Sequence, residues 1–217
     1  MEIKQYVSLA LNSNMYVLKE NNRSIIIDPC VDTEWGSSQV DWIILTHEHY
    51  DHISMANTIR EKYNCPILCG HICGERIVNS SRNFSRYFDA LVALHNGRKR
   101  SGVKTPDYIC HADKTFCDTT AIMWEEHEII LTETPGHSPG SICVIFDNSV
   151  LFSGDSLIPA NETVIRFPGG NEKDFINKTI PYLQSLPENT VVYPGHYGSF
   201  RLWDHTVIQE GGKVTCS

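Results

Sequence analysis

Residues 42–52 read Trp-Ile-Ile-Leu-Thr-His-Glu-His-Tyr-Asp-His, an apolar run that passes directly into three histidines and an aspartate. The apolar run predicts a strand that is buried on both faces. His47, His49, Asp51 and His52 cannot all point one way from a strand or a helix, but a loop leaving the strand can gather their side chains into a small volume. Imidazole and carboxylate groups together suit zinc, iron or manganese. The stretch therefore predicts a metal-binding loop.

Three later segments repeat this arrangement. His137 lies in Thr-Pro-Gly-His-Ser-Pro-Gly, Asp155 in Phe-Ser-Gly-Asp, and His196 in Tyr-Pro-Gly-His. Each residue is of a metal-binding type, follows a predicted strand and lies beside a glycine, where the backbone can turn sharply. Four such segments argue against an incidental histidine-rich surface loop and predict a metal centre.

The order of these residues resembles the metallo-β-lactamase superfamily, whose pattern is His-x-His-x-Asp-His followed by a separate His, an Asp and a last His. The resemblance covers the chain from about Asp28 to Gly198. It implies an α/β fold, a four-layer αββα sandwich with two metals at one edge between the sheets. The implied ligands are His47, His49 and His137 for the first metal, Asp51, His52 and His196 for the second, and Asp155 as a bridge. Asp28 matches a position outside the metal shell that helps to hold the motif loop.

Within the superfamily, the chain is most similar to the glyoxalase II-like (hydroxyacylglutathione hydrolase) branch. The matching stretches are residues 136–141, 152–157 and 194–196. Residues 165–170 (Ile-Arg-Phe-Pro-Gly-Gly) replace the Gly-Arg-x-Asp that the branch often has. The glutathione-thioester enzymes also continue into a helical segment after the last histidine, where this chain has only about twenty residues. The resemblance implies ester or thioester hydrolysis and leaves glutathione recognition open. True β-lactamases lack an aspartate in the bridging role.

These residues predict a hydrolase that uses a metal-bound hydroxide on a thioester or ester. Two divalent ions, zinc first and iron or manganese as alternatives, would lower the pKa of a water from about 15.7 toward 7. Asp51 is the expected catalytic residue that handles the proton. The alternative is a mononuclear iron sulfur (persulfide) dioxygenase of the same fold, in which His47, His137 and Asp155 hold one ferrous ion. A non-catalytic member of the fold is disfavoured, because every expected ligand is present.

The length of 217 residues predicts a single domain. Two strand-rich halves, each with helices, are typical of an α/β sandwich. An amphipathic helix is expected over Ser81–Leu94, with Ser81 as its N-cap. A last helix is expected over Glu172–Leu186, interrupted near Pro181.

The formal charge of −8 disfavours a nucleic-acid or anionic-membrane partner. The charge reverses to +4 between His71 and Asp107, within a partly helical insertion at about residues 71–113. This segment is either a lid that recruits an anionic small-molecule or carrier-bound thioester, or a solvated surface whose charge is incidental. The candidate substrate contacts are Arg98, Lys99 and Arg100 in this segment, together with Arg166 and Tyr197.

The N-terminus lacks a secretory signal, and no apolar run approaches the roughly 18 residues of a membrane span. We therefore expect a cytoplasmic protein. In that reducing compartment, the eight cysteines are expected to be mostly free or buried thiols.

Overall fold

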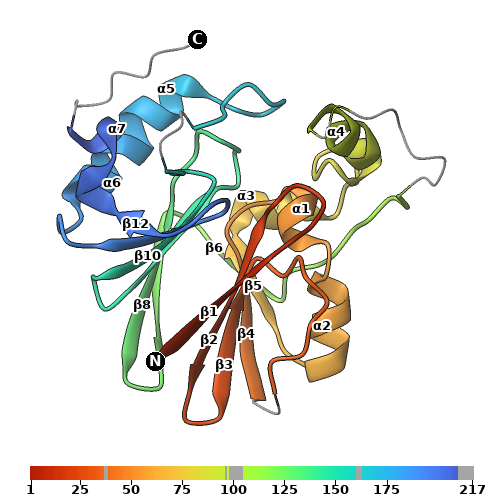
Figure 1. Ribbon diagram of the computed structural model, residues 1–217, viewed down its shortest axis with the longest axis horizontal. Helices are drawn as coiled ribbons and strands as arrows, with labels where there is room; N and C mark the ends of the chain where they lie inside the picture. The colour runs from red at the N-terminus through yellow and green to blue at the C-terminus, as the bar shows by residue number, and fades with distance from the viewer. Residues whose placement is uncertain (37–38, 96, 98–104, 160–162, 210–217) are drawn as a thin grey trace. The chain divides into compact units, whose positions relative to one another are not determined.

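The computed structural model describes residues 1–36, 39–95, 97, 105–159 and 163–209 (Figure 1). The chain divides into two compact units, with the boundary in the sequence between Thr115 and Phe116. Arg98, Lys99 and Arg100 lie outside the described residues. In the described part of the chain, every helix is too short or too polar to cross a bilayer.

The first unit is built on a mixed sheet with strand order β1-β2-β3-β4-β5-β6. Its strands are β1 (Glu2–Val7), β2 (Asn14–Glu20), β3 (Arg23–Ile27), β4 (Gln39–Leu45), β5 (Ile67–Gly70) and β6 (Lys114–Phe116). Its helices are α1 (Tyr50–Ile53), α2 (Ala56–Tyr63), α3 (His71–Ile77), the 3-10 turn η1 (Ser85–Tyr87) and α4 (Phe88–His95). Helix α2 packs beside β4 and α3 beside β5.

The parallel strands of this sheet explain where the motif loop lies. β4 pairs in parallel with β3 and with β5, and its apolar residues Ile43 and Leu45 are completely buried, as the sequence predicts. Parallel neighbours end at the same edge of a sheet. Asp28 follows β3, and the histidine motif follows β4, so the two arrive at this edge together.

The prediction of a helix over Ser81–Leu94 was wrong for the first half of this segment. Phe84 has a left-handed backbone with φ +65°, which no α-helix accommodates, and α4 begins only at Phe88. Ser81 is not an N-cap, because η1 begins only at Ser85 and α4 at Phe88. Leu94 is 81% exposed, so the apolar stripe of this segment does not end in a core.

The second unit is built on a sheet with strand order β12-β11-β10-β9-β8-β7. Its strands are β7 (Thr119–Trp124), β8 (His127–Glu133), β9 (Ile142–Phe146), β10 (Val150–Gly154), β11 (Val191–Pro194) and β12 (Phe200–Arg201). Its helices are α5 (Glu172–Asp174), the π-helical turn η2 (Phe175–Thr179), α6 (Ile180–Ser185), the 3-10 turn η3 (Leu202–Asp204) and α7 (Thr206–Gln209). β10 and β11 are parallel, and the other pairs are antiparallel.

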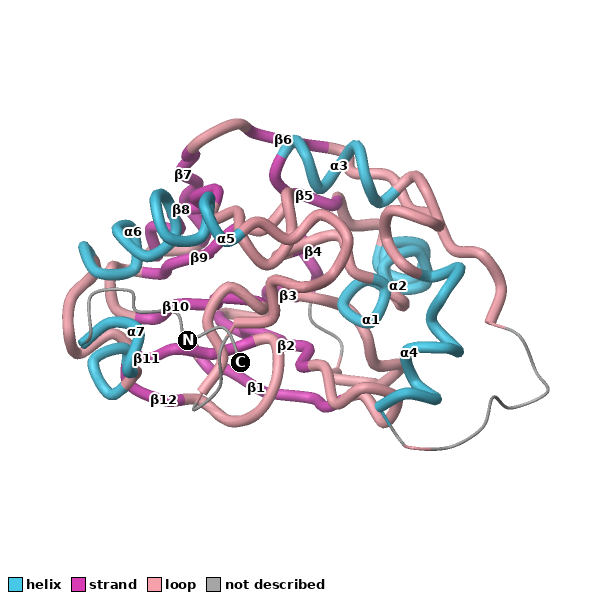
Figure 2. The backbone as a smooth tube through the Cα atoms, turned by 90° about the horizontal axis from the view of Figure 1, so that it is seen from above, coloured by secondary structure: helices cyan, strands magenta, loops and turns pink. Residues whose placement is uncertain are grey.

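Two features of the second unit follow from the sequence. The expected interruption near Pro181 is the π-helical turn, which precedes this proline in one helical stretch from α5 to α6 (Figure 2). A proline cannot donate a backbone hydrogen bond, so the helix widens before it. The parallel pair β10–β11 aligns Gly154 with Pro194, which brings Asp155 and the loop of His196 to one edge.

The cysteines are mostly buried thiols. All seven described cysteines are free, and only Cys117 is exposed. Burial raises the pKa of the Cys110 and Cys143 thiols to about 12, and that of Cys65 to about 11. These thiols are therefore protonated near neutral pH and are poor nucleophiles or metal ligands.

Candidate functional site

Asp28 ties the end of β3 to the histidine motif in the first unit. It is almost completely buried and has a left-handed backbone with φ +53°. Its Oδ1 accepts a hydrogen bond from the backbone N–H of Thr46 at 2.7 Å, and its Oδ2 accepts one from the Thr46 hydroxyl at 2.6 Å. The same Oδ2 lies 3.2 Å from Nδ1 of His52. One carboxylate therefore fixes both ends of the motif, which is the supporting role expected for Asp28.

These contacts determine the tautomers of two histidines. The Thr46 hydroxyl has a single hydrogen, which it donates to Asp28, so its oxygen accepts from Nδ1 of His47 at 3.0 Å. His52 donates its Nδ1–H to Asp28. In both rings the proton is on Nδ1, and Nε2 carries the lone pair that binds a metal.

The motif side chains gather in a small volume. The ring of His47 lies 4.4 Å from that of His52 and 4.6 Å from that of His49, measured between centroids. His52 Nε2 is 3.4 Å from Oδ2 of Asp51, which also accepts a hydrogen bond from the Ser13 hydroxyl at 2.7 Å. Two ligand atoms bound at about 2.1 Å in tetrahedral geometry lie roughly 3.4 Å apart. The Asp51–His52 spacing therefore fits two ligands of one ion.

A buried ion pair and an aromatic ring support the loop between the ligands. Glu48 is 0% exposed, and its Oε1 accepts a hydrogen bond from Nε of Arg76 at 2.5 Å. The ring of Phe84 packs against that of His49 with centroids 4.8 Å apart. The backbone N–H of Tyr50 donates to the carbonyl of Asn83 at 2.8 Å. Arg76 and residues 83–84 therefore support the motif loop through contacts with residues 48–50.

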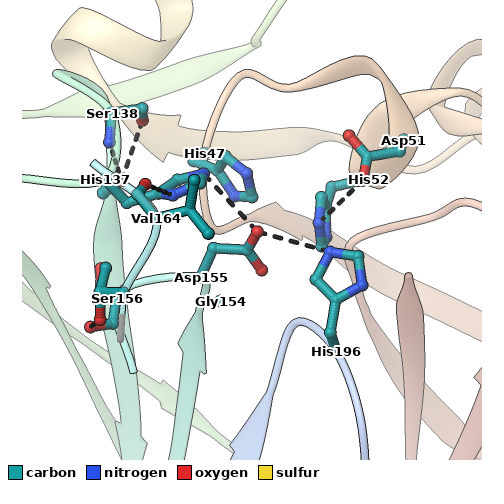
Figure 3. A network of polar contacts seen from close by, with 12 residues as sticks. His47, Asp51, His52, His137, Ser138, Gly154, Asp155, Ser156, Val164 and His196 are labelled. Atoms are coloured by element: carbon teal, nitrogen blue, oxygen red, sulfur yellow. Dashed lines mark hydrogen bonds and ion pairs between the residues drawn. The ribbon is translucent and has the colours of Figure 1, made fainter. Parts of the chain in front are cut away.

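In the second unit, a glycine and a carbonyl fix His137. Gly136 has φ +152°, and a Cβ atom there would lie 2.9 Å from the Cα of Phe175, so only glycine fits. His137 donates its Nδ1–H to the carbonyl of Val164 at 2.6 Å, which leaves the lone pair on Nε2 (Figure 3). This is the same tautomer that His47 and His52 adopt.

Asp155 lies between two of the histidines of this unit (Figure 3). Its Oδ2 is 3.6 Å from Nε2 of His137 and 3.4 Å from Nε2 of His196. The turn that carries His196 is held in place by the Gly195 N–H, which donates to the carbonyl of Gly154 at 2.8 Å. One carboxylate oxygen flanked by two imidazole nitrogens fits a metal-bridging carboxylate, and the donor set of both units suits zinc, iron or manganese.

The structure thus brings the expected ligands together within each unit. His47, His49, Asp51 and His52 cluster in the first unit, as do His137, Asp155 and His196 in the second. Of the candidate substrate contacts that are described, Arg166 lies exposed in the loop before Gly170, and Tyr197 follows His196 directly and is exposed.

Four supporting residues were missed from the sequence. They are Ser13, Glu48, Arg76 and Phe84. Glu48 carried a usable signal, because a carboxylate inside a buried motif requires a cation. The partner could not be identified, since Arg76 lies 28 positions away and counted only as one of several basic residues.

Comparison with known proteins identifies the fold. The family model of the metallo-beta-lactamase superfamily matches residues 9–196, across both units. The crystal structure of the BLEG-1 B3 metallo-beta-lactamase superposes with a TM-score of 0.76 at 25% identity, covering 99% of this chain and 100% of that one. ETHE1 from Myxococcus xanthus superposes with a TM-score of 0.66 at 17% identity, covering 99% and 84%. The expected α/β fold is confirmed, with two mixed sheets and flanking helices.

Three curated relatives are also similar over most of this chain. The probable metallo-hydrolase YqgX of Bacillus subtilis is 26% identical over 86% of this chain and 85% of its own. The probable polyketide biosynthesis zinc-dependent hydrolase BaeB of Bacillus velezensis is 24% identical over 90% and 77%. A hydroxyacylglutathione hydrolase of Rhizobium etli is 24% identical over 73% of this chain, but over only 48% of its own length.

Proposed function

The chain belongs to the metallo-β-lactamase superfamily, and from that premise we propose that it is a dinuclear metal-dependent hydrolase of thioesters or esters. The observation that carries the proposal is the tethering of three histidines. His47, His52 and His137 each have Nδ1 held by a fixed acceptor, so that Nε2 is the ligating atom in all three. Structural histidines have no need for one common tautomer, whereas metal-binding histidines do.

We propose ligand roles for the seven candidate residues. The proposed assignment is His47, His49 and His137 for one ion, Asp51, His52 and His196 for the other, and Asp155 for both. Asp28 acts through the ligands as a positioning residue. Zinc is the first candidate, consistent with the relative BaeB, whose name describes a zinc-dependent hydrolase.

The chain's own residues then have distinct tasks in hydrolysis. Two bound divalent ions would supply an attacking hydroxide at neutral pH and polarise the substrate carbonyl. Ser13 donates to Oδ2 of Asp51 at 2.7 Å and so orients that carboxylate, which accepts the proton of the attacking water. A thiol leaving group, with an ordinary pKa near 8.5, departs as thiolate with little acid assistance. Hydrolysis of a thioester therefore requires the fewest catalytic groups beyond these residues.

We further propose an anionic substrate, either a small thioester or an acyl group on an acidic carrier. Arg76 and Arg86 of the basic segment pair with Glu48 and Asp107, so these two charges serve the fold. The docking role falls to the other basic residues, including Arg98, Lys99 and Arg100. Neutralising those three together is expected to weaken carrier-bound turnover while leaving small-ester turnover intact. Equal loss with both substrates would exclude the docking role.

The test begins with metal content and a substrate panel. Protein purified without added metal is expected to hold close to two equivalents of zinc, iron or manganese per chain. Thioesters are assayed by release of free thiol, β-lactams with a chromogenic cephalosporin, and persulfides by oxygen consumption. Asp155→Ala is expected to lower metal content and to abolish turnover. His71→Ala is the control, because His71 is an exposed histidine outside the ligand set.

Each outcome discriminates between the hypotheses. Thioester turnover that follows metal content supports the proposal. One equivalent of iron with persulfide oxidation would replace it by the dioxygenase with His47, His137 and Asp155 as ligands. Hydrolysis of β-lactams alone would place the chain functionally with BLEG-1 instead.

A further inference from the structure

Two aromatic residues of this protein, Phe84 and Tyr197, have a left-handed backbone conformation. Eleven described residues other than glycine have positive φ, and eight of them are asparagine or aspartate, which adopt it at low cost. The other three are Phe84, Glu125 and Tyr197. Glu125 lies in the turn between β7 and β8, where positive φ is usual. The two aromatic residues have no such simple account.

Both aromatic rings lie next to a proposed metal ligand. Phe84 lies 4.8 Å from the ring of His49, and Tyr197 lies 6.4 Å from the ring of His196. Their surroundings differ, because Phe84 is 8% exposed and Tyr197 is 56% exposed. Burial offsets the backbone strain of Phe84. The strain of Tyr197 has no comparable compensation from burial.

The turn itself does not require a tyrosine. Gly195 anchors it to Gly154, and Tyr197 then adopts φ +69°. Glycine would adopt this conformation without strain. Gly198 follows, and a Cβ atom there would meet nothing within 4 Å. The residue at position 197 is therefore a large ring in a strained conformation, beside open space and a ligand histidine, and such strain is characteristic of functional positions.

We infer that Tyr197 is a specificity-determining residue whose ring contacts the acyl portion of a substrate held at the metal centre. The inference rests on the proposed metal centre and extends it. An aromatic ring offers a large contact area at low cost in side-chain entropy. Tyr197 therefore favours acyl groups that are aromatic or bulky over acetyl groups.

The test measures binding without turnover. Acetohydroxamate and benzohydroxamate chelate metals through the same group and differ in the acyl portion. Their affinities for the metal-loaded protein are measured by calorimetry for wild type, Tyr197→Gly, Tyr197→Phe and Glu125→Gly. Tyr197→Gly is expected to lower the affinity for benzohydroxamate at least tenfold and the affinity for acetohydroxamate less than threefold. Tyr197→Phe is expected to keep both affinities within threefold of wild type, because the aromatic ring remains.

Glu125→Gly is the matched control, since it removes the backbone strain of another left-handed residue in the same unit, outside the proposed centre. It is expected to leave both affinities unchanged. The melting temperature of Tyr197→Gly should be equal to or above that of wild type, because glycine removes the strain. A fall of more than about 4 °C, roughly 1 kcal/mol for a chain of this size, would show that Tyr197 stabilises the fold instead.

The remaining outcomes also decide the question. Equal weakening of both hydroxamates by Tyr197→Gly, or no weakening, overturns the inference. Absence of binding to wild type overturns it together with the metal centre. The expected pattern in a protein that hydrolyses no thioester would refute the proposed reaction and leave the role of Tyr197 standing.

Discussion

The buried pair of Glu48 and Arg76 allows a quantitative prediction. Glu48 is 0% exposed, the Arg76 side chain is 17% exposed, and the two atoms that join them are 2.5 Å apart. Arg76→Met removes the cation and leaves a carboxylate where water cannot replace it. Breaking a buried ion pair on one side costs about 3–5 kcal/mol. We expect the free energy of unfolding to fall by that amount.

The double variant tests the reasoning behind this magnitude. Glu48→Gln/Arg76→Met replaces the pair by neutral side chains of similar length. Neutral replacement of a buried pair is often close to neutral in stability. The double variant should therefore be more stable than Arg76→Met alone, by at least about 2 kcal/mol. A loss equal to the sum of the two single variants would mean that the residues do not interact energetically.

Urea unfolding of metal-free protein, followed by circular dichroism, measures these differences. Arg86→Met is the matched control, because Arg86 pairs with Asp107 at 2.7 Å where both side chains are well exposed. Exposed pairs contribute about 0–1 kcal/mol, so this variant should lie close to wild type. The reasoning is refuted if Arg76→Met also costs less than about 1 kcal/mol.

Three further predictions concern thiols, pH and backbone space. In native protein near pH 8, Cys117 should be the one described thiol that reacts rapidly with a disulfide reagent, since burial shields the others from the reagent. Burial lowers the pKa of His205, which donates its Nε2–H to the carbonyl of Ile158, so stability should fall as the pH drops below about 6.5 and stay level above it. Gly136→Ala should destabilise the second unit and weaken metal binding, because the added Cβ meets the backbone of Phe175.

Each of these predictions has a control. Cys117→Ser should remove the rapid phase from the described thiols, and rapid reaction of several thiols in that variant would contradict the burial. His205→Gln should reduce the loss of stability between pH 6.5 and 5, and an unchanged slope would assign that loss to other groups. Gly198→Ala is the control for Gly136→Ala, since a Cβ at position 198 meets no atom. Equal stability of the two glycine variants would refute the steric argument.

Much of the candidate site follows from sequence, because metal ligands are few in type and their strand-end positions are local. The motif after β4, Gly136-His137, Gly154-Asp155 and Gly195-His196 are each recognisable from neighbouring residues alone. The strands that carry them were also expected, since residues 42–45 of β4 and 150–152 of β10 are apolar. The start of α4 was not, because the left-handed backbone of Phe84 depends on contacts that a helical periodicity does not contain.

The tertiary structure decided the contacts between residues that are distant in sequence. Asp28 and His52 are separated by 24 positions, Ser13 and Asp51 by 38, and His137 and Val164 by 27. Each contact selects a proton position or a side-chain orientation at the ligands. The sequence alone determined which residue types could bind metal and where the strands present them. Their tautomers, the cation for Glu48 and the strained ring of Tyr197 depend on backbone geometry and packing, which no local pattern encodes.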